Sequence, residues 1–241
     1  MKIVFVGPTL PDARVLAAKD IIIRPPAIQG DLLRAVRSGA SAIGIIDGNF
    51  EYVAPIWHKE VLHALSHGVK VYGAASMGAL RAAECADFGM IGVGRIFSDY
   101  AAGILEDDAD VALLHGPAEL GYLPLTVPLV NVLATLECLQ QTAAITADAG
   151  AALERAASAI FYKERTWSEI VRRAGLASPI DRQWLATVLK SGAVDQKRMD
   201  ALELFGLMAA ADDRRGERPA GWAFRATSMW KVVASSADAA G

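Results

Sequence analysis

The chain is poor in cysteine and has no long apolar run. Cys85 and Cys138 are its two cysteines in 241 residues, too few for a disulfide framework and without the spacing of a zinc site. No apolar run approaches the ~18 residues that a membrane-spanning helix needs. The N-terminal apolar stretch is too short and too soon interrupted for a signal peptide. We therefore expect a cytoplasmic protein with no membrane partner and no metal site.

An excess of charge of one sign is also missing. The formal net charge is −3 and the basic residues are scattered, so we expect no nucleic-acid partner. Gly7-Pro8-Thr9 lacks the glycine spacing and the lysine of a phosphate-binding loop, and we expect no cofactor. The acidic run at residues 106–110 could bind a cation or a basic partner, but the pattern is more typical of a solvated loop.

More than half of the residues are hydrophobic, and in the first half of the chain they form alternating short and periodic stretches. Continuous apolar runs predict strands, and apolar residues at helical spacing predict the helices between them. The expected strands are 3–6, 21–23, 42–46 and 69–73, and the expected helices are 28–36, 57–65 and 77–86. This alternation predicts an α/β fold with a mostly parallel sheet flanked by helices.

The second half of the chain has a different pattern. Helical spacing recurs over residues 129–141, 147–162, 166–174, 181–189 and 196–211. From Asp212 the sequence holds charge, glycine and proline, and we expect its end, Ser235–Gly241, to be loose. The predicted organisation is an α/β core domain at 1–125, followed by an α-helical C-terminal region at 126–241 that packs on the core.

Ser76 stands where the fourth expected strand gives way to a helix. Its hydroxyl could cap that helix, which is the commoner use of serine at such a position. It could also be a nucleophile, with the N–H groups of Met77 and Gly78 placed to hold an oxyanion. The turn resembles a hydrolase nucleophile elbow, although the G-x-S-x-G pattern is absent.

A nucleophilic serine needs a base. None of the four histidines, His58, His63, His67 and His115, has an obvious orienting acid nearby in sequence. Lys59 could serve if its pKa fell towards neutrality through burial. Helical periodicity favours a solvated Lys59 and a packed His58, although a long side chain near the start of a helix can reach the edge of the sheet.

Three other charged residues are candidates for substrate binding. Arg81 and Glu84 are three apart in a mostly apolar helix, where they could form a structural ion pair or hold an anionic substrate. Asp47 follows the third expected strand. Because parallel strands end at the same edge of a sheet, Asp47 and Ser76 should both lie there. Cys85 is expected to be a buried thiol.

Several uncommon strings resemble the TfuA-like family, and they cover roughly residues 3 to 130. In chain order they are VFVGPTL, PPAIQGDLLRA, IIDGNFEYVAPIWHKEVLHAL, GVKVYGAASMGALRAAE, FGMIGVGRIFSDY and EDDADVALLH. Ala75 is a departure, because the family more often carries a second serine there.

The resemblance implies a hydrolase that releases sulfide from the thiocarboxylated C-terminus of a ThiS-like sulfur carrier. That sulfide would supply a YcaO enzyme, which converts peptide-backbone amides to thioamides. The implied machinery is a serine–lysine pair, which maps onto Ser76 and Lys59, with Lys163 as a second candidate for the base. The alternatives are a non-catalytic adaptor that docks carrier and peptide onto the YcaO enzyme, and a stand-alone hydrolase of small molecules.

Overall fold

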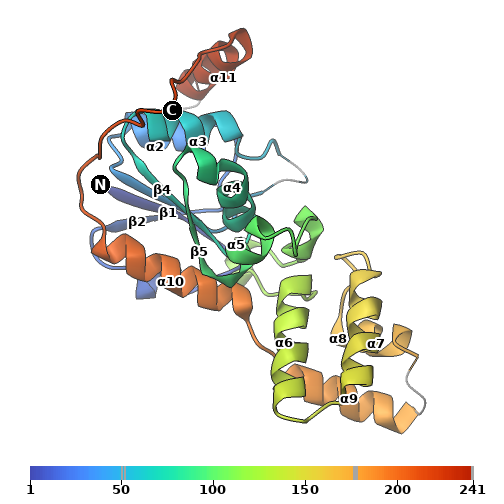
Figure 1. Cartoon of the computed structure of the whole chain (residues 1–241). Helices are drawn as coiled ribbons and strands as arrows, with labels where there is room; N and C mark the ends of the chain where they lie inside the picture. The colour runs from blue at the N-terminus through green and yellow to red at the C-terminus, as the bar shows by residue number, and fades with distance from the viewer. Residues whose placement is uncertain (50, 52, 176–178, 240–241) are drawn as a thin grey trace. The chain divides into compact units, whose positions relative to one another are not determined.

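Five parallel strands form one sheet, which confirms the predicted α/β class (Figure 1). The strands are β1 (Lys2–Phe5), β2 (Ile21–Arg24), β3 (Ala42–Ile45), β4 (Lys70–Ala74) and β5 (Ile91–Val93), in the spatial order β2-β1-β3-β4-β5. All four pairings are parallel, so the carboxyl ends of the strands share one edge. The order reverses between β1 and β3, and ligands of doubly wound sheets bind beside such a reversal.

The computed structural model describes residues 1–49, 51, 53–175 and 179–239, which fall into two compact units. The first comprises Met1–Ile104 and Arg198–Gly241 and contains the sheet, and the second comprises Leu105–Lys197. The boundary expected after residue 125 therefore lies inside the second unit. Most of α10 (Gln196–Ala210) and all of α11 (Ser228–Ala239) belong with the sheet.

One face of the sheet is covered by α2 (Asp31–Arg37), α3 (His58–Ser66) and α4 (Met77–Cys85). Alternate strand residues point to opposite faces, and Ile3, Phe5, Ile43 and Val71 pack against these helices. The helices contribute residues at helical spacing, such as Val61, Ala64 and Leu65 of α3. On this side of the sheet, the apolar strand residues and the apolar faces of the helices are thus buried against one another, as the sequence pattern predicts.

The opposite face is covered by α1 (Ala13–Leu16) and α10. Ala201, Leu204 and Met208 of α10 pack against strand residues that include Val4 and Tyr72. Figure 1 shows α10 across the sheet from α2 and α3. A segment from the C-terminal part of the chain thus completes the sandwich, because both faces of a parallel sheet must be covered.

The sequence reading missed several elements of the first unit, α1 among them. Strand β5 and helix α5 (Gly94–Ala101) lie in a glycine-containing stretch to which no element was assigned. Helix α11 occupies most of the stretch that was expected to be loose, and that expectation was wrong for residues 235–239. Residues 240 and 241 lie outside the described residues. Trp230 explains the order of α11, since it is buried against Leu33 of α2.

The second unit is helical, as predicted. It contains α6 (Leu129–Gln141), α7 (Ala147–Ser158), α8 (Trp167–Arg173) and α9 (Pro179–Ser191). Their apolar faces form a separate core around side chains such as Val132, Leu153, Ile170 and Leu189. None of the described helices of either unit has both the length and the apolar character needed to cross a membrane.

Candidate functional site

The turn between β4 and α4 is strained. Ala75 has a φ of 66°, a left-handed conformation that residues other than glycine rarely adopt. The N–H of Ser76 donates to the carbonyl of Ala74 at 2.7 Å, which closes a three-residue γ-turn around Ala75. Such strain persists only where the surroundings enforce it, and it is concentrated at functional sites.

Ser76 is the residue that this turn presents at the start of α4. Its side chain makes no capping hydrogen bond to the helix, and its hydroxyl has no partner among the described residues. The commoner expectation for Ser76, a helix cap, is therefore not realised. Ser76 is 7% exposed, so only a small part of it is open to a substrate.

The two amides expected to form an oxyanion site differ in their bonding. The N–H of Gly78 donates to the carbonyl of Ile46 at 3.2 Å, and in this conformation it is not a free donor. This corrects the role assigned to Gly78. The N–H of Met77 has no acceptor among the described residues and keeps the capacity to bind an anion.

Gly78 has a structural reason to be glycine. A Cβ atom at this position would lie 1.8 Å from the carbonyl oxygen of Ile45, at the end of β3. Only glycine allows α4 to approach the sheet so closely. The backbone of β3 thus occupies the space that a side chain at residue 78 would need.

Lys59 lies in the first turn of α3 and points towards the C-terminal segment. Its Nζ donates to the carbonyl of Arg225 at 2.7 Å and lies 5.4 Å from the centre of the Phe224 ring. No hydrogen bond joins Lys59 to Ser76 among the described residues. The structure therefore does not bring the predicted nucleophile and base into contact.

His58, Arg81 and Glu84 form one cluster between α3 and α4. Glu84 Oε2 lies 2.8 Å from His58 Nε2 and accepts a bond from Arg81 Nη1 at 2.6 Å. Arg81 also donates from Nε to the carbonyl of Ile56 at 3.3 Å. Partial burial opposes ionisation of Glu84, but the bonds to His58 and Arg81 hold its pKa below the usual range. His58 thus has an orienting acid, which the sequence did not reveal.

Asp47 fastens the loop after β1 at the point where the strand order reverses. Its Oδ2 accepts the N–H groups of Gly7 at 2.8 Å and Thr9 at 3.0 Å, and its Oδ1 accepts the Thr9 hydroxyl at 2.5 Å. The side chain is 2% exposed. These three bonds use the carboxylate internally, so Asp47 shapes the edge of the sheet rather than presenting a free charge there.

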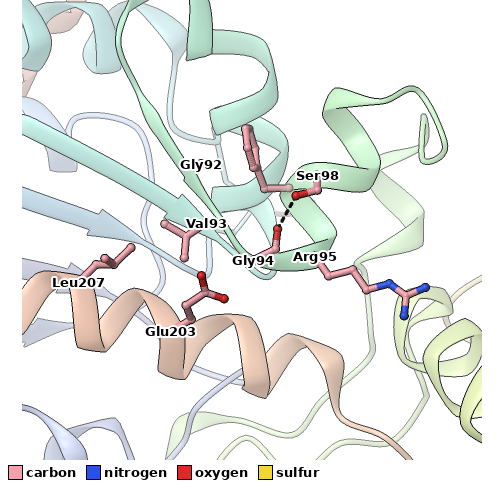
Figure 2. Close-up of a pocket in the computed structure, with 8 residues that line it drawn as sticks. Gly92, Val93, Gly94, Arg95, Ser98, Glu203 and Leu207 are labelled. Carbon is pink, nitrogen blue, oxygen red and sulfur yellow. Dashed lines mark hydrogen bonds between the residues drawn. The ribbon is translucent and has the colours of Figure 1, made fainter.

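A cavity of about 350 Å³ lies beside the carboxyl end of β5 (Figure 2). It is lined by the Gly92–Arg95 turn, by α5 and by Glu203 and Leu207 of α10. Buried Asp200 caps α5 by accepting the N–H of Ile96 at 2.8 Å. In Figure 2 the side chain of Arg95 points away from Glu203. The cavity shares the strand-end edge with Ser76, but Ser76 does not line it.

The remaining candidates lie in the second unit. The Nζ of Lys163 lies 5.7 Å from the centre of the Tyr162 ring. In the acidic run, Asp107 accepts the N–H of Ala109 at 2.9 Å and begins a short 3₁₀ turn at Asp108–Asp110. Glu106 and Asp108 are exposed. The described residues hold no group of three side chains suited to a metal ion.

A comparison with known protein families identifies the family to which this chain is similar. Residues 47–166 match the family described as TfuA-like protein, and the match includes the β4–α4 turn with Ser76. The chain belongs to the TfuA-like family. No curated protein matched it. The TfuA-like match begins just after β3, spans α3, β4 and α4, and continues into the first helices of the second unit.

Proposed function

We propose that this TfuA-like protein hydrolyses the thiocarboxylated C-terminus of a ThiS-like sulfur carrier. The sulfide released would supply a YcaO enzyme for thioamidation of a peptide backbone. The observation that carries the proposal is the strained turn at Ala75, which holds an unbonded serine hydroxyl at the carboxyl ends of the strands. A helix cap would not require that strain, whereas a nucleophile benefits from it.

The chemistry needs few groups. The Ser76 oxygen attacks the thiocarboxyl carbon, its proton passes to a base, and the C–S bond breaks to release hydrosulfide. Water then attacks the resulting ester and frees the carrier's carboxylate and the serine. The Met77 N–H supports this scheme as a donor to the tetrahedral oxyanion. Arg81, which is mostly buried beside Glu84, would attract the anionic end of the carrier.

Lys59 is the proposed base, and its use requires a movement of the side chain. The Nζ atom must leave the carbonyl of Arg225, where it now donates. One exposed hydrogen bond and one ring contact hold it there, and together these are worth only about 1–3 kcal/mol. A bound carrier tail could supply that amount by displacing the C-terminal segment.

The hydrogen bonds of Lys59 and of the Gly78 amide favour a second, non-catalytic function. Lys59 is bonded to Arg225 and the Gly78 amide to Ile46, so two of the expected catalytic groups are occupied. A non-catalytic adaptor that docks carrier and peptide onto the YcaO enzyme would need neither group. Ser76 would then line a binding surface.

Sulfide release from thiocarboxylated carrier separates the two functions. The hydrolase predicts that Ser76→Ala reduces the rate at least about 100-fold, as expected when a nucleophile is lost. Ser38→Ala is the matched control, because Ser38 is exposed at the end of α2 and donates only within its own helix. A non-catalytic adaptor instead predicts no sulfide release by the wild-type protein alone, and full thioamidation when the YcaO enzyme is supplied with Ser76→Ala. Full sulfide release by Ser76→Ala would exclude Ser76 as the nucleophile.

A further inference from the structure

The C-terminal segment before α11 is fastened to the first unit far from Ser76. Arg215 donates to the carbonyls of Val36 and Ala40 at 2.6 and 2.9 Å. The N–H of Gly216 donates to the carbonyl of Gly68 at 2.7 Å. These bonds fix the segment across the C-terminal ends of α2 and α3, next to the start of β4.

A cavity of about 360 Å³ lies between this segment and the end of α3. That volume suits a small organic ligand. The lining residues are Ser66, His67, Arg218, Pro219, Trp222 and Phe224, together with Ala223. All of them belong to the first unit. We refer to this space as the α3 cavity.

Two aromatic walls of the α3 cavity are held in place from outside it. Trp222 donates its indole N–H to the carbonyl of Phe88 at 3.2 Å and meets the Phe88 ring edge-on at 5.7 Å. Phe224 packs against Trp230 at 5.0 Å and against His63 at 5.3 Å. Since side chains and backbone of the protein itself make these contacts, little ordering of the walls would be needed on binding.

The polar groups of the α3 cavity are basic. Arg218 has no carboxylate or other hydrogen-bond partner among the described residues. The Nδ1 atom of His67 lies 2.8 Å from the carbonyl of His63, so it is the protonated nitrogen, and Nε2 is left without a partner in the described part of the chain. Ser66 turns its hydroxyl to the His63 carbonyl at 2.8 Å. No acidic side chain lines the cavity.

We propose that the α3 cavity binds a small organic anion with a flat aromatic body. The body would lie against Trp222 and Phe224, and its carboxylate, sulfonate or phosphate would pair with Arg218. A cation is disfavoured by the charge of Arg218. The His67 end of α3 precedes β4, whereas Ser76 follows the other end of that strand. The α3 cavity therefore lies towards the opposite end of β4 from Ser76, although its wall residue Phe224 also contacts Lys59.

Binding of 2-naphthoate, measured by isothermal titration calorimetry on the full chain, tests the proposal. The neutral isostere 2-naphthamide is the ligand control. We expect 2-naphthoate to bind with a Kd of roughly 1 mM or below, and the amide about tenfold more weakly. Arg218→Glu should weaken 2-naphthoate about tenfold or more, because it reverses the charge that faces the anion.

Arg214→Glu is the matched control, since Arg214 is an exposed arginine of the same segment that does not line the cavity. It should leave the Kd for 2-naphthoate unchanged. Arg218 is also exposed, so its replacement should leave the thermal unfolding curve in place. Three results each overturn the proposal: no binding of 2-naphthoate, equal binding of the amide, or an unchanged Kd in Arg218→Glu. None of them affects the proposed hydrolysis at Ser76.

Discussion

Replacement of Asp47 by alanine should strongly destabilise the strand-end edge of the sheet. The carboxylate accepts two backbone N–H groups, of Gly7 and Thr9, and the Thr9 hydroxyl, all in a buried setting. Alanine removes the acceptor and leaves both amides without a partner. Each buried donor that loses its acceptor costs about 1–3 kcal/mol, and the hydroxyl can rotate towards another acceptor. The expected loss of unfolding free energy is therefore about 3–5 kcal/mol.

Asparagine at the same position separates charge from geometry. An amide oxygen in place of Oδ2 would still accept both N–H groups, and the amide nitrogen in place of Oδ1 would donate to the Thr9 hydroxyl. Only the strengthening due to the charge is lost, so Asp47→Asn should cost about 1–2 kcal/mol. The ordering of wild type, asparagine and alanine is the specific expectation.

Urea denaturation with hydrogen exchange at the Gly7 and Thr9 amides measures both effects. In Asp47→Ala the unfolding midpoint should fall, and these two amides should exchange much faster than neighbouring strand amides. In Asp47→Asn they should remain protected. An alanine variant within about 0.5 kcal/mol of wild type, the range of ordinary surface substitutions, would refute the view that Asp47 fastens this edge.

Three further predictions concern glycine, histidine and arginine. Gly78→Ala should lower the free energy of unfolding, measured by urea denaturation, by at least about 2 kcal/mol, because the added methyl group would lie 1.8 Å from a carbonyl oxygen. Gly206→Ala is the control: nothing lies within 4 Å of the added methyl group in α10, and it should raise the free energy of unfolding by about 0.5–1 kcal/mol. Burial lowers the pKa of His63 from 6.5 to about 4. As the pH falls, His63 is therefore protonated in the unfolded chain at a higher pH than in the folded protein, and the free energy of unfolding should decrease between pH 6.5 and 4. His63→Phe should make this decrease with pH smaller. Arg165→Leu should destabilise the second unit by about 2–4 kcal/mol, since the buried guanidinium serves three backbone carbonyls, while exposed Arg155→Leu should change thermal unfolding little.

The sequence was sufficient for the parts of the fold that repeat a local pattern. Apolar runs and helical spacing located four of the strands and most of the helices, and parallel strands brought Asp47 and Ser76 to one edge. β5 was not predicted because it is a three-residue strand with a central glycine. α11 was not predicted because its order depends on the packing of Trp230 against Leu33, which is a contact between segments that are distant in the sequence.

The side-chain geometry of the site was less predictable, for identifiable reasons. Lys59 is bonded to a carbonyl 166 residues later in the chain, and no local spacing encodes such a partner. The Gly78 amide is occupied because α4 approaches β3 so closely. Periodicity placed His58 in the apolar stripe of its helix, but the side chain lies half exposed beside Glu84. The sequence identified Ser76 as a candidate nucleophile at the strand-to-helix turn. It did not predict the strained backbone at Ala75, because an alanine gives no sign of a left-handed conformation.

Acid-quenched mass spectrometry of the protein mixed with thiocarboxylated sulfur carrier tests the central claim most directly. Nucleophilic attack predicts an ester that joins the carrier's C-terminus to Ser76, found in the peptide that contains the β4–α4 turn and absent from Ser76→Ala. Sulfide release at the full rate by Ser76→Ala, or an acyl group carried by another residue, would contradict it.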